Sequence, residues 1–245
     1  MNSTVYKKIY ASATLALLCS VSLAQQANNL ACGNVHSKDG FGPFDYRAEG
    51  YIPESTYGSH AALLNIVESG HFTPKVEALI RGETARSPAG DLHYTLVRFP
   101  NHHRALVAIE NLGIREKVAQ PVQAGYSVEC YFLRAVTWRP NDRIARMLFA
   151  QFLVKAARLE EANVQLIAAS ELAPDNPFTQ NNIGLIYFDM KDYEKSVEHA
   201  HKAMALGLGL PTLKNKLKGV NAWREPVAES EAAASHPAAS EPKKY

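Results

Sequence analysis

The sequence lacks a strong excess of charge of either sign. Its 26 Lys and Arg residues face 24 Asp and Glu residues, which gives a formal charge of +2. Lys7 and Lys8 lie in an N-terminal segment that we expect to be removed, and no acidic residue precedes Ala24, so the mature chain balances 24 basic with 24 acidic residues. Such a chain offers no electrostatic reason to bind nucleic acid or an anionic membrane, and we expect neither as a partner.

Recognisable catalytic motifs are also missing. The sequence contains no GxSxG nucleophile turn, no phosphate-binding GxxxxGK[ST] loop, no GxGxxG and no CxxC. We therefore predict no catalytic residue, no metal ligand and no cofactor, and we expect a protein that is not an enzyme. A missing motif does not by itself exclude an enzyme.

No apolar run is long enough to span a membrane. The longest, from about Ala11 to Val21, falls short of the roughly 20 residues that a bilayer requires. It follows Lys7 and Lys8 and precedes Ser22-Leu23-Ala24, the arrangement of a signal peptide that is cleaved after Ala24. We expect a periplasmic or secreted protein without a membrane span; a retained anchor and lipidation at Cys19 are the alternatives.

Cysteine is scarce. Removal of the signal peptide would leave only Cys32 and Cys130. Because an even number of cysteines in an oxidising compartment favours pairing, we predict a Cys32–Cys130 disulfide. Two separate buried thiols are the alternative.

The strongest positive signal is a sequence repeat in the C-terminal half. The number of residues between Pro140 and Pro174 equals the number between Ala150 and Gly184. The same spacing recurs in further sets: Ala135, Ala169 and Ala203, and Leu153 with Tyr187. It equals the tetratricopeptide period of about 34 residues and predicts pairs of helices.

Each recurring residue type has a physical reason. Ala150 and Gly184 are expected where the two helices of a pair cross, because a larger side chain would separate the backbones. Pro140 and Pro174 should end the second helices. Asn176 followed by Pro177 is typical of a helix start, with a capping side chain and then a proline at the first helical position.

These residues resemble the tetratricopeptide-repeat (TPR) family. The segment NNIGLIYFDMKDYEKSVEHAHKAMAL, residues 181–206, is the closer match to the family pattern. Residues 143–174 match this pattern nearly as well, but they lack the early tryptophan and have Leu153 in place of the aromatic residue. The resemblance implies a solenoid of antiparallel helix pairs that binds protein or peptide partners in a concave groove.

Upstream, the pattern is less regular. Asn101 and Gly113 are expected to bound a first helix, and Ser127 to Arg139 a second, which together form a third, irregular repeat. Pro211 is expected to open a capping helix that carries Leu213, Leu217 and Trp223, with a disordered tail after it.

The region from Cys32 to Phe99 does not follow the repeat. Its FGPFDYR segment predicts irregular chain held by packed rings, and helices are expected from Ser59 to Gly70, from Thr73 to Gly82 and over residues 91–98. The motifs GPFDYR, HFTPKVEAL, DLHYTLVRFPNHHRAL and CYFLRA resemble a group of exported bacterial repeat proteins, and this resemblance implies no biochemical role.

The predicted organisation is therefore all-α. It comprises a signal peptide (1–24), an irregular, mostly helical N-terminal region (25–100), TPR-like repeats with a capping helix (101–223) and a tail (224–245).

The resemblance places the binding groove on the first helix of each repeat. Asn182 occupies a position where an amide can pair with a ligand backbone, although it could equally cap or join helices. We expect replacement of Asn182 and Gln151 to weaken partner capture with little loss of stability. The predicted groove residues are Ile144, Met147, Gln151, Lys155, Phe178, Asn181, Asn182, Leu185 and Asp189.

Two alternatives remain open. A histidine-rich group in the N-terminal half could form a metal-binding or hydrolytic site, since imidazoles and carboxylates are zinc ligand types, although their spacing matches no tight motif. That hypothesis requires His71, His93 and His102 to converge. Alternatively, the N-terminal region could fill the groove and block it. The candidate metal-binding group is Glu68, His71, Asp91, His93, His102 and His103.

Overall fold

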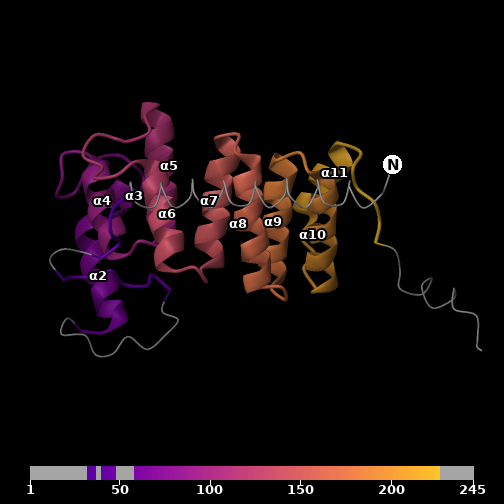
Figure 1. The fold of residues 1–245 in the computed structure, drawn as a ribbon, viewed down its shortest axis with the longest axis horizontal. Helices are drawn as coiled ribbons and strands as arrows, with labels where there is room; N and C mark the ends of the chain where they lie inside the picture. Colours follow the sequence, from indigo (N-terminus) through magenta and orange to yellow (C-terminus); the bar gives the residue numbers. More distant parts are fainter. Residues whose placement is uncertain (1–31, 37–39, 48–57, 227–245) are drawn as a thin grey trace, which may run out of the picture. The chain divides into compact units, whose positions relative to one another are not determined.

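The computed structural model describes residues 32–36, 40–47 and 58–226 (Figure 1). Across these residues the regular structure is entirely helical, without a strand, so the predicted all-α class is confirmed. The predicted signal peptide, its cleavage site and most of the predicted tail lie outside the described residues. The ten described helices are α2 His60–His71, α3 Pro74–Glu77, α4 Pro88–Arg98, α5 His103–Glu116, α6 Val128–Trp138, α7 Arg143–Lys155, α8 Leu159–Leu172, α9 Pro177–Asp189, α10 Tyr193–Ala205 and α11 Pro211–Gly219.

The chain divides into two compact units. The first extends to Ala173 and the second begins at Pro174. The first unit contains α2 to α8, and the second contains α9 to α11. The predicted domain boundary at residue 100 falls inside the first unit and stays a prediction.

Each unit contains one extensively packed helix pair, α7 with α8 and α9 with α10. The two pairs are offset along the sequence by one repeat period: α9 begins and ends one period after α7, and α10 begins one period after α8. A short turn joins the helices of each pair, so the partners run antiparallel. The turns also match, because Ala157 and Lys191 both adopt a left-handed backbone, with φ of 58° and 63°.

The small residues lie at close helix contacts, as predicted. Ser196 of α10 donates its hydroxyl to the carbonyl of Gly184 on α9 at 2.8 Å. A methyl group on Gly184 would lie 3.2 Å from the Ser196 carbonyl oxygen and 2.6 Å from Leu213, so a glycine permits this approach. Ala150 and Ala162, at the equivalent positions of the first pair, are fully buried.

Most predicted helix starts and stops are confirmed. Ser59, Ser127 and Asn176 each accept a backbone N–H at the start of a helix. Helices α6 and α8 end shortly before Pro140 and Pro174.

Two predicted helix boundaries in the first unit are wrong. The helix that begins after Thr73 ends at Glu77 rather than near Gly82, because Leu79 turns into the left-handed region at φ 58°. His102, not Asn101, caps α5, and its ring nitrogen Nδ1 accepts the N–H of Ala105.

Two further details of the predicted helices are also corrected. Helix α5 continues through Gly113 to Glu116. Trp223 lies beyond the end of α11, although it still packs against the cluster formed by Ala200, Leu213 and Leu217.

The described part of the FGPFDYR segment is irregular and held by aromatic packing, as expected. The Phe44 ring centroid lies 5.2 Å from that of Phe41 and 5.5 Å from that of Phe99. These rings pack on a small core that includes Leu63 and Val67 of α2.

The predicted disulfide between Cys32 and Cys130 is present and ties the start of the described chain to α6. The buried Arg134, one turn further along α6, donates hydrogen bonds to the carbonyl oxygens of Cys32, Asn34 and Val35. Its guanidinium also lies 4.4 Å from the ring centroid of Tyr126. Residues 32–35 are therefore fixed to α6 both covalently and by charge-assisted hydrogen bonds.

Among the described residues, none of the helices combines the length and the apolar character needed to cross a bilayer.

Candidate functional site

Helices α5 and α7 pack together in the first unit and leave one side of each helix exposed along the contact. Exposed and half-buried residues recur every three or four positions on both helices, as expected for one helical face. We call this surface the α5/α7 face. Its members are Arg104, Val107, Asn111, Ile114 and Lys117 from α5 and its C-cap, and Ile144, Leu148, Gln151 and Lys155 from α7.

Apolar side chains give the face its character. Val107, Ile114 and Ile144 expose 37%, 56% and 36% of their surface, respectively. Complete burial of a large apolar side chain is favourable by about 1.5 to 3 kcal/mol, and a side chain that stays in contact with water does not gain this free energy. A partner that covers them would recover part of it.

A hollow lies between the first halves of the two helices. We call it the amino-terminal hollow, and its volume is about 390 Å³. Val107 and Ile144 provide its apolar walls. Its lining residues are Glu77, His103, Arg104, Val107, Ala108, Asn111, Ile144 and Leu148.

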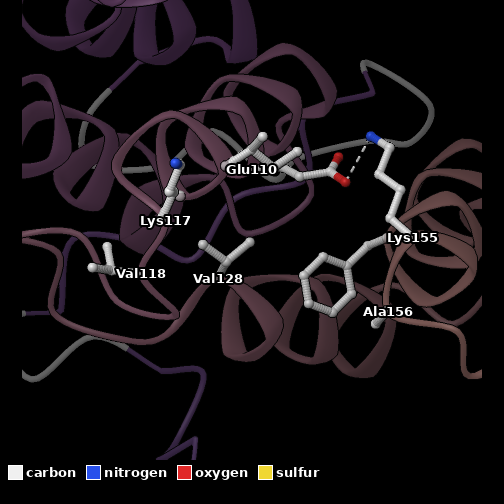
Figure 2. Close-up of a pocket in the computed structure, with 9 residues that line it drawn as sticks. Glu110, Lys117, Val118, Val128, Lys155 and Ala156 are labelled. Carbon is white, nitrogen blue, oxygen red and sulfur yellow. Dashed lines mark hydrogen bonds and ion pairs between the residues drawn. The ribbon is translucent and has the colours of Figure 1, made fainter.

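A second hollow, of about 270 Å³, lies between the last turns of α5 and α7 and the first turn of α6 (Figure 2). We call it the carboxyl-terminal hollow. In Figure 2, Val118, Val128 and Ala156 lie on one side of it, and the charged groups of Glu110 and Lys155 meet on the other. The full lining is Glu110, Gly113, Ile114, Lys117, Val118, Val128, Phe152, Lys155 and Ala156.

Gly113 allows the carboxyl-terminal hollow to close at its base. A methyl group at this position would lie 2.8 Å from Cγ2 of Val128 and 3.2 Å from the carbonyl oxygen of Val118. The glycine therefore lets the start of α6 approach α5.

The charged side chains of the amino-terminal hollow form ion pairs within the protein. The Arg104 guanidinium forms two hydrogen bonds with the Glu77 carboxylate and lies 3.6 Å from Glu68. The hydrogen bonds from Arg104 lower the pKa of Glu77, and the bonded carboxylate raises that of Arg104. Both groups stay charged and neutralise each other at neutral pH.

His103 lies at the edge of the same hollow and is held by Asp142. Its Nε2 lies 2.9 Å from one Asp142 oxygen, and Asn101 donates to that oxygen at 2.8 Å. Burial alone would raise the pKa of Asp142, but hydrogen bonds from His103, Ala145 N–H and Asn101 lower it to about 2. Asp142 also caps α7 through Ile144 N–H and Ala145 N–H, so the network fixes α5 and α7 relative to each other.

The histidines of the candidate metal site do not converge on one point. In the portions of the chain that the structure describes, no group of three or more His, Cys, Asp or Glu residues is arranged to hold a metal ion. The histidines take separate partners: His71 with Asp91 at 2.9 Å, His102 with Glu68 at 3.0 Å, His93 with Tyr131 at 2.9 Å, and His103 with Asp142.

His102 is a neutral structural histidine. Burial lowers its pKa to about 3, and the charges of Arg104 and His103 act in the same direction. Because its Nδ1 accepts the N–H of Ala105, the proton of the neutral ring lies on Nε2 and is donated to Glu68.

The predicted groove residues fall in both units. In the first unit, Gln151 and Lys155 are exposed on the α5/α7 face, whereas Met147 is 7% exposed. In the second unit, Asn181 is also 7% exposed. On α9, Phe178, Asn182 and Asp189 are exposed, and Leu185 is half-buried. Their role in binding stays a prediction.

The α5 half of the face was missed by sequence reasoning. Residues 101–113 were expected to form the first helix of an irregular repeat, but the regular spacing begins only at Tyr131, so no groove position was assigned to Val107, Ile114 or Lys117. The signal was present as helical spacing: Arg104, Val107, Asn111 and Ile114 follow each other at intervals of three or four. The Glu110–Lys155 ion pair joins residues 45 apart and has no local signature.

No protein-family model matches the chain, and no curated protein matches it. Its fold therefore defines its class: an all-helical protein in which paired helices pack in sequence.

Proposed function

We propose that the chain is an exported TPR-type scaffold that binds a segment of another polypeptide on its α5/α7 face. The observation that carries the proposal is the pair of adjacent hollows along two neighbouring helices, with Val107, Ile114 and Ile144 exposed beside them. An apolar helix face of this kind suits an extended or helical peptide better than a small cofactor, because the contacts continue along the helices.

The scaffold class is supported by the offset of one repeat period between the α7/α8 and α9/α10 pairs, including the matched turns at Ala157 and Lys191. Export is supported by the predicted signal peptide, and the Cys32–Cys130 disulfide is consistent with an oxidising compartment. We infer that Phe178, Asn182, Leu185 and Asp189 form the corresponding surface of the second unit.

Self-occlusion remains the alternative for the groove. None of the described residues between 32 and 47 lines either hollow. We therefore propose that both hollows of the α5/α7 face accept a partner and are not filled by these N-terminal residues.

Peptide display tests the proposal. The exported, oxidised protein is used to select from a library of random short peptides, and the enriched pool is then bound to two double variants. Val107→Gln/Ile144→Gln removes apolar side chains from the face, whereas Val164→Gln/Ile167→Gln makes the same changes on α8, where these residues are 51% and 47% exposed.

We expect the first variant to bind the pool about tenfold more weakly, which corresponds to about 1.4 kcal/mol of lost apolar burial. The α8 variant should bind as the unmodified protein does. Equal binding by both variants, or the absence of any enriched pool, would contradict the proposal.

A further inference from the structure

The two hollows of the α5/α7 face differ in charge. In the amino-terminal hollow, Arg104 and Glu77 neutralise each other, and His103 is bonded to Asp142. The charged residues that line the carboxyl-terminal hollow are one acid, Glu110, and two lysines, Lys117 and Lys155. The second hollow therefore carries one excess positive charge.

This positive charge is available to a ligand. Lys155 donates one hydrogen bond to Glu110 at 2.9 Å, yet its ammonium has three donors and its side chain is 54% exposed. Lys117 is exposed at the C-cap of α5, and no carboxylate of the described residues pairs with it. A carboxylate at the rim could accept hydrogen bonds from either ammonium without displacing Glu110.

The rest of the hollow is apolar. Ile114, Val118, Val128 and Phe152 surround the floor, which closes over Gly113. Its volume of about 270 Å³ is below the roughly 300 to 1,000 Å³ of sites that enclose whole small molecules. It suits one large side chain that enters from a longer ligand.

We propose that the carboxyl-terminal hollow binds a large apolar side chain of a partner polypeptide that has an Asp or Glu side chain within about one helical turn of it. The apolar side chain packs on Ile114 and Phe152, and the acidic side chain meets Lys117 and Lys155. This inference rests on the proposed function and specifies the chemistry of its partner. The apolar contact provides most of the affinity and the charge provides selectivity, because exposed ion pairs contribute little free energy.

The test uses synthetic peptides. Three of the most enriched library sequences are made as C-terminal amides, each with a copy in which every Asp and Glu is replaced by Asn and Gln. Dissociation constants are measured by fluorescence anisotropy in low and high salt, with the unmodified protein and with Lys117→Gln.

Lys191→Gln is the matched control, because Lys191 is an exposed lysine with a similar left-handed backbone, φ 63° against 56° for Lys117. Ile114→Gln tests the apolar contact, with Ile167→Gln as its control.

We expect removal of the acids to weaken binding about threefold to fivefold in low salt, and less in high salt. Lys117→Gln should lose this preference for acidic peptides, whereas Lys191→Gln should keep it. Ile114→Gln should weaken binding of every selected peptide about fivefold, and Ile167→Gln should not.

The binding results distinguish a failure of the charge inference from a failure of the proposed function. If Val107→Gln/Ile144→Gln weakens binding but the enriched sequences carry no acid, or their neutral copies bind equally well, the charge inference is wrong and the proposed function stands. If no variant of the face weakens binding, both fail. If sedimentation shows that the protein forms a dimer that Ile114→Gln dissociates, a second copy covers the hollow and the inference is overturned.

Discussion

The Lys155 ammonium lies 2.9 Å from the Glu110 carboxylate and joins the last turn of α7 to α5 across the edge of the carboxyl-terminal hollow. The two side chains differ in environment: Lys155 is 54% exposed and Glu110 only 5%. The pair therefore places a carboxylate largely out of water, and the lysine is what compensates it.

Because the buried Glu110 carboxylate is compensated by Lys155, replacing the lysine alone should destabilise the protein. Lys155→Met should lower the free energy of unfolding by about 1 to 3 kcal/mol, because it leaves a buried carboxylate without its cation. Adding Glu110→Gln should recover at least about 1 kcal/mol of that loss. Urea unfolding of the two single variants and the double variant measures the coupling, and strictly additive effects would contradict this view of the pair.

A second prediction concerns Gly184. Alanine is favoured over glycine within a helix by up to about 1 kcal/mol, but here its methyl group would lie 3.2 Å from a backbone carbonyl oxygen and 2.6 Å from the buried Leu213. Gly184→Ala should therefore destabilise the second unit by about 1 to 3 kcal/mol. Gly219→Ala on α11, where nothing lies within 4 Å, is the control and should be neutral or stabilising. Thermal unfolding that ranks the two variants in the opposite order would show that the close crossing is not required.

The C-terminal helices could be predicted because their signals are local or periodic. A small residue at a crossing, a proline after a helix and the Asn176-Pro177 start each act on neighbouring chain, and most of these signals recur at the repeat period. The N-terminal misses have non-local causes. Asn101 resembles a cap, but its amide group donates to Asp45 at 2.7 Å and to Asp142 at 2.8 Å, partners that lie 56 and 41 positions away in the sequence.

The early end of α3 could not be predicted from the local sequence. The left-handed position that ends a helix favours glycine, yet Leu79 occupies it here, so the sequence directed attention to Gly82. On the candidate site, the repeat pattern located Gln151 and Lys155 on α7 but could not supply the facing residues of α5.

A third prediction concerns the covalent link between residues 32 and 130. In the chain-entropy model, a disulfide between cysteines 98 positions apart stabilises the protein by about 4.7 kcal/mol. Cys32→Ala/Cys130→Ala should shift the urea midpoint of the first unit to lower concentration. Reductant should have the same effect on the unmodified protein and none on the double variant. Equal midpoints for the oxidised protein and the variant would contradict the prediction.

A fourth prediction concerns pH. Burial lowers the pKa of His199 to about 4, and its Nδ1 lies 2.7 Å from Gln180 Oε1, so the ring stays neutral in the folded protein at neutral pH. In the unfolded chain the pKa of this histidine is near 6.5. Between these values the unfolded chain binds more protons, so stability should fall as the pH decreases from about 6.5 to about 4, by on the order of 3 kcal/mol from this residue.

His199→Gln removes the titrating group and should flatten that pH dependence. An NMR titration, with the His199 signal assigned through this variant, should show the ring unprotonated at pH 5.5. A midpoint near 6.5 would contradict the neutral, buried state.

The central claim is that a partner polypeptide covers the α5/α7 face. Isoleucine residues lie on and off this face, so NMR of protein labelled at the isoleucine δ1 methyl groups tests the claim directly. On titration with a selected peptide, we expect the largest shifts at Ile114 and Ile144 and little change at Ile66 and Ile167, which are exposed elsewhere in the first unit. Larger shifts at Ile66 or Ile167 than at Ile114 and Ile144 would place the partner on another surface and contradict the account.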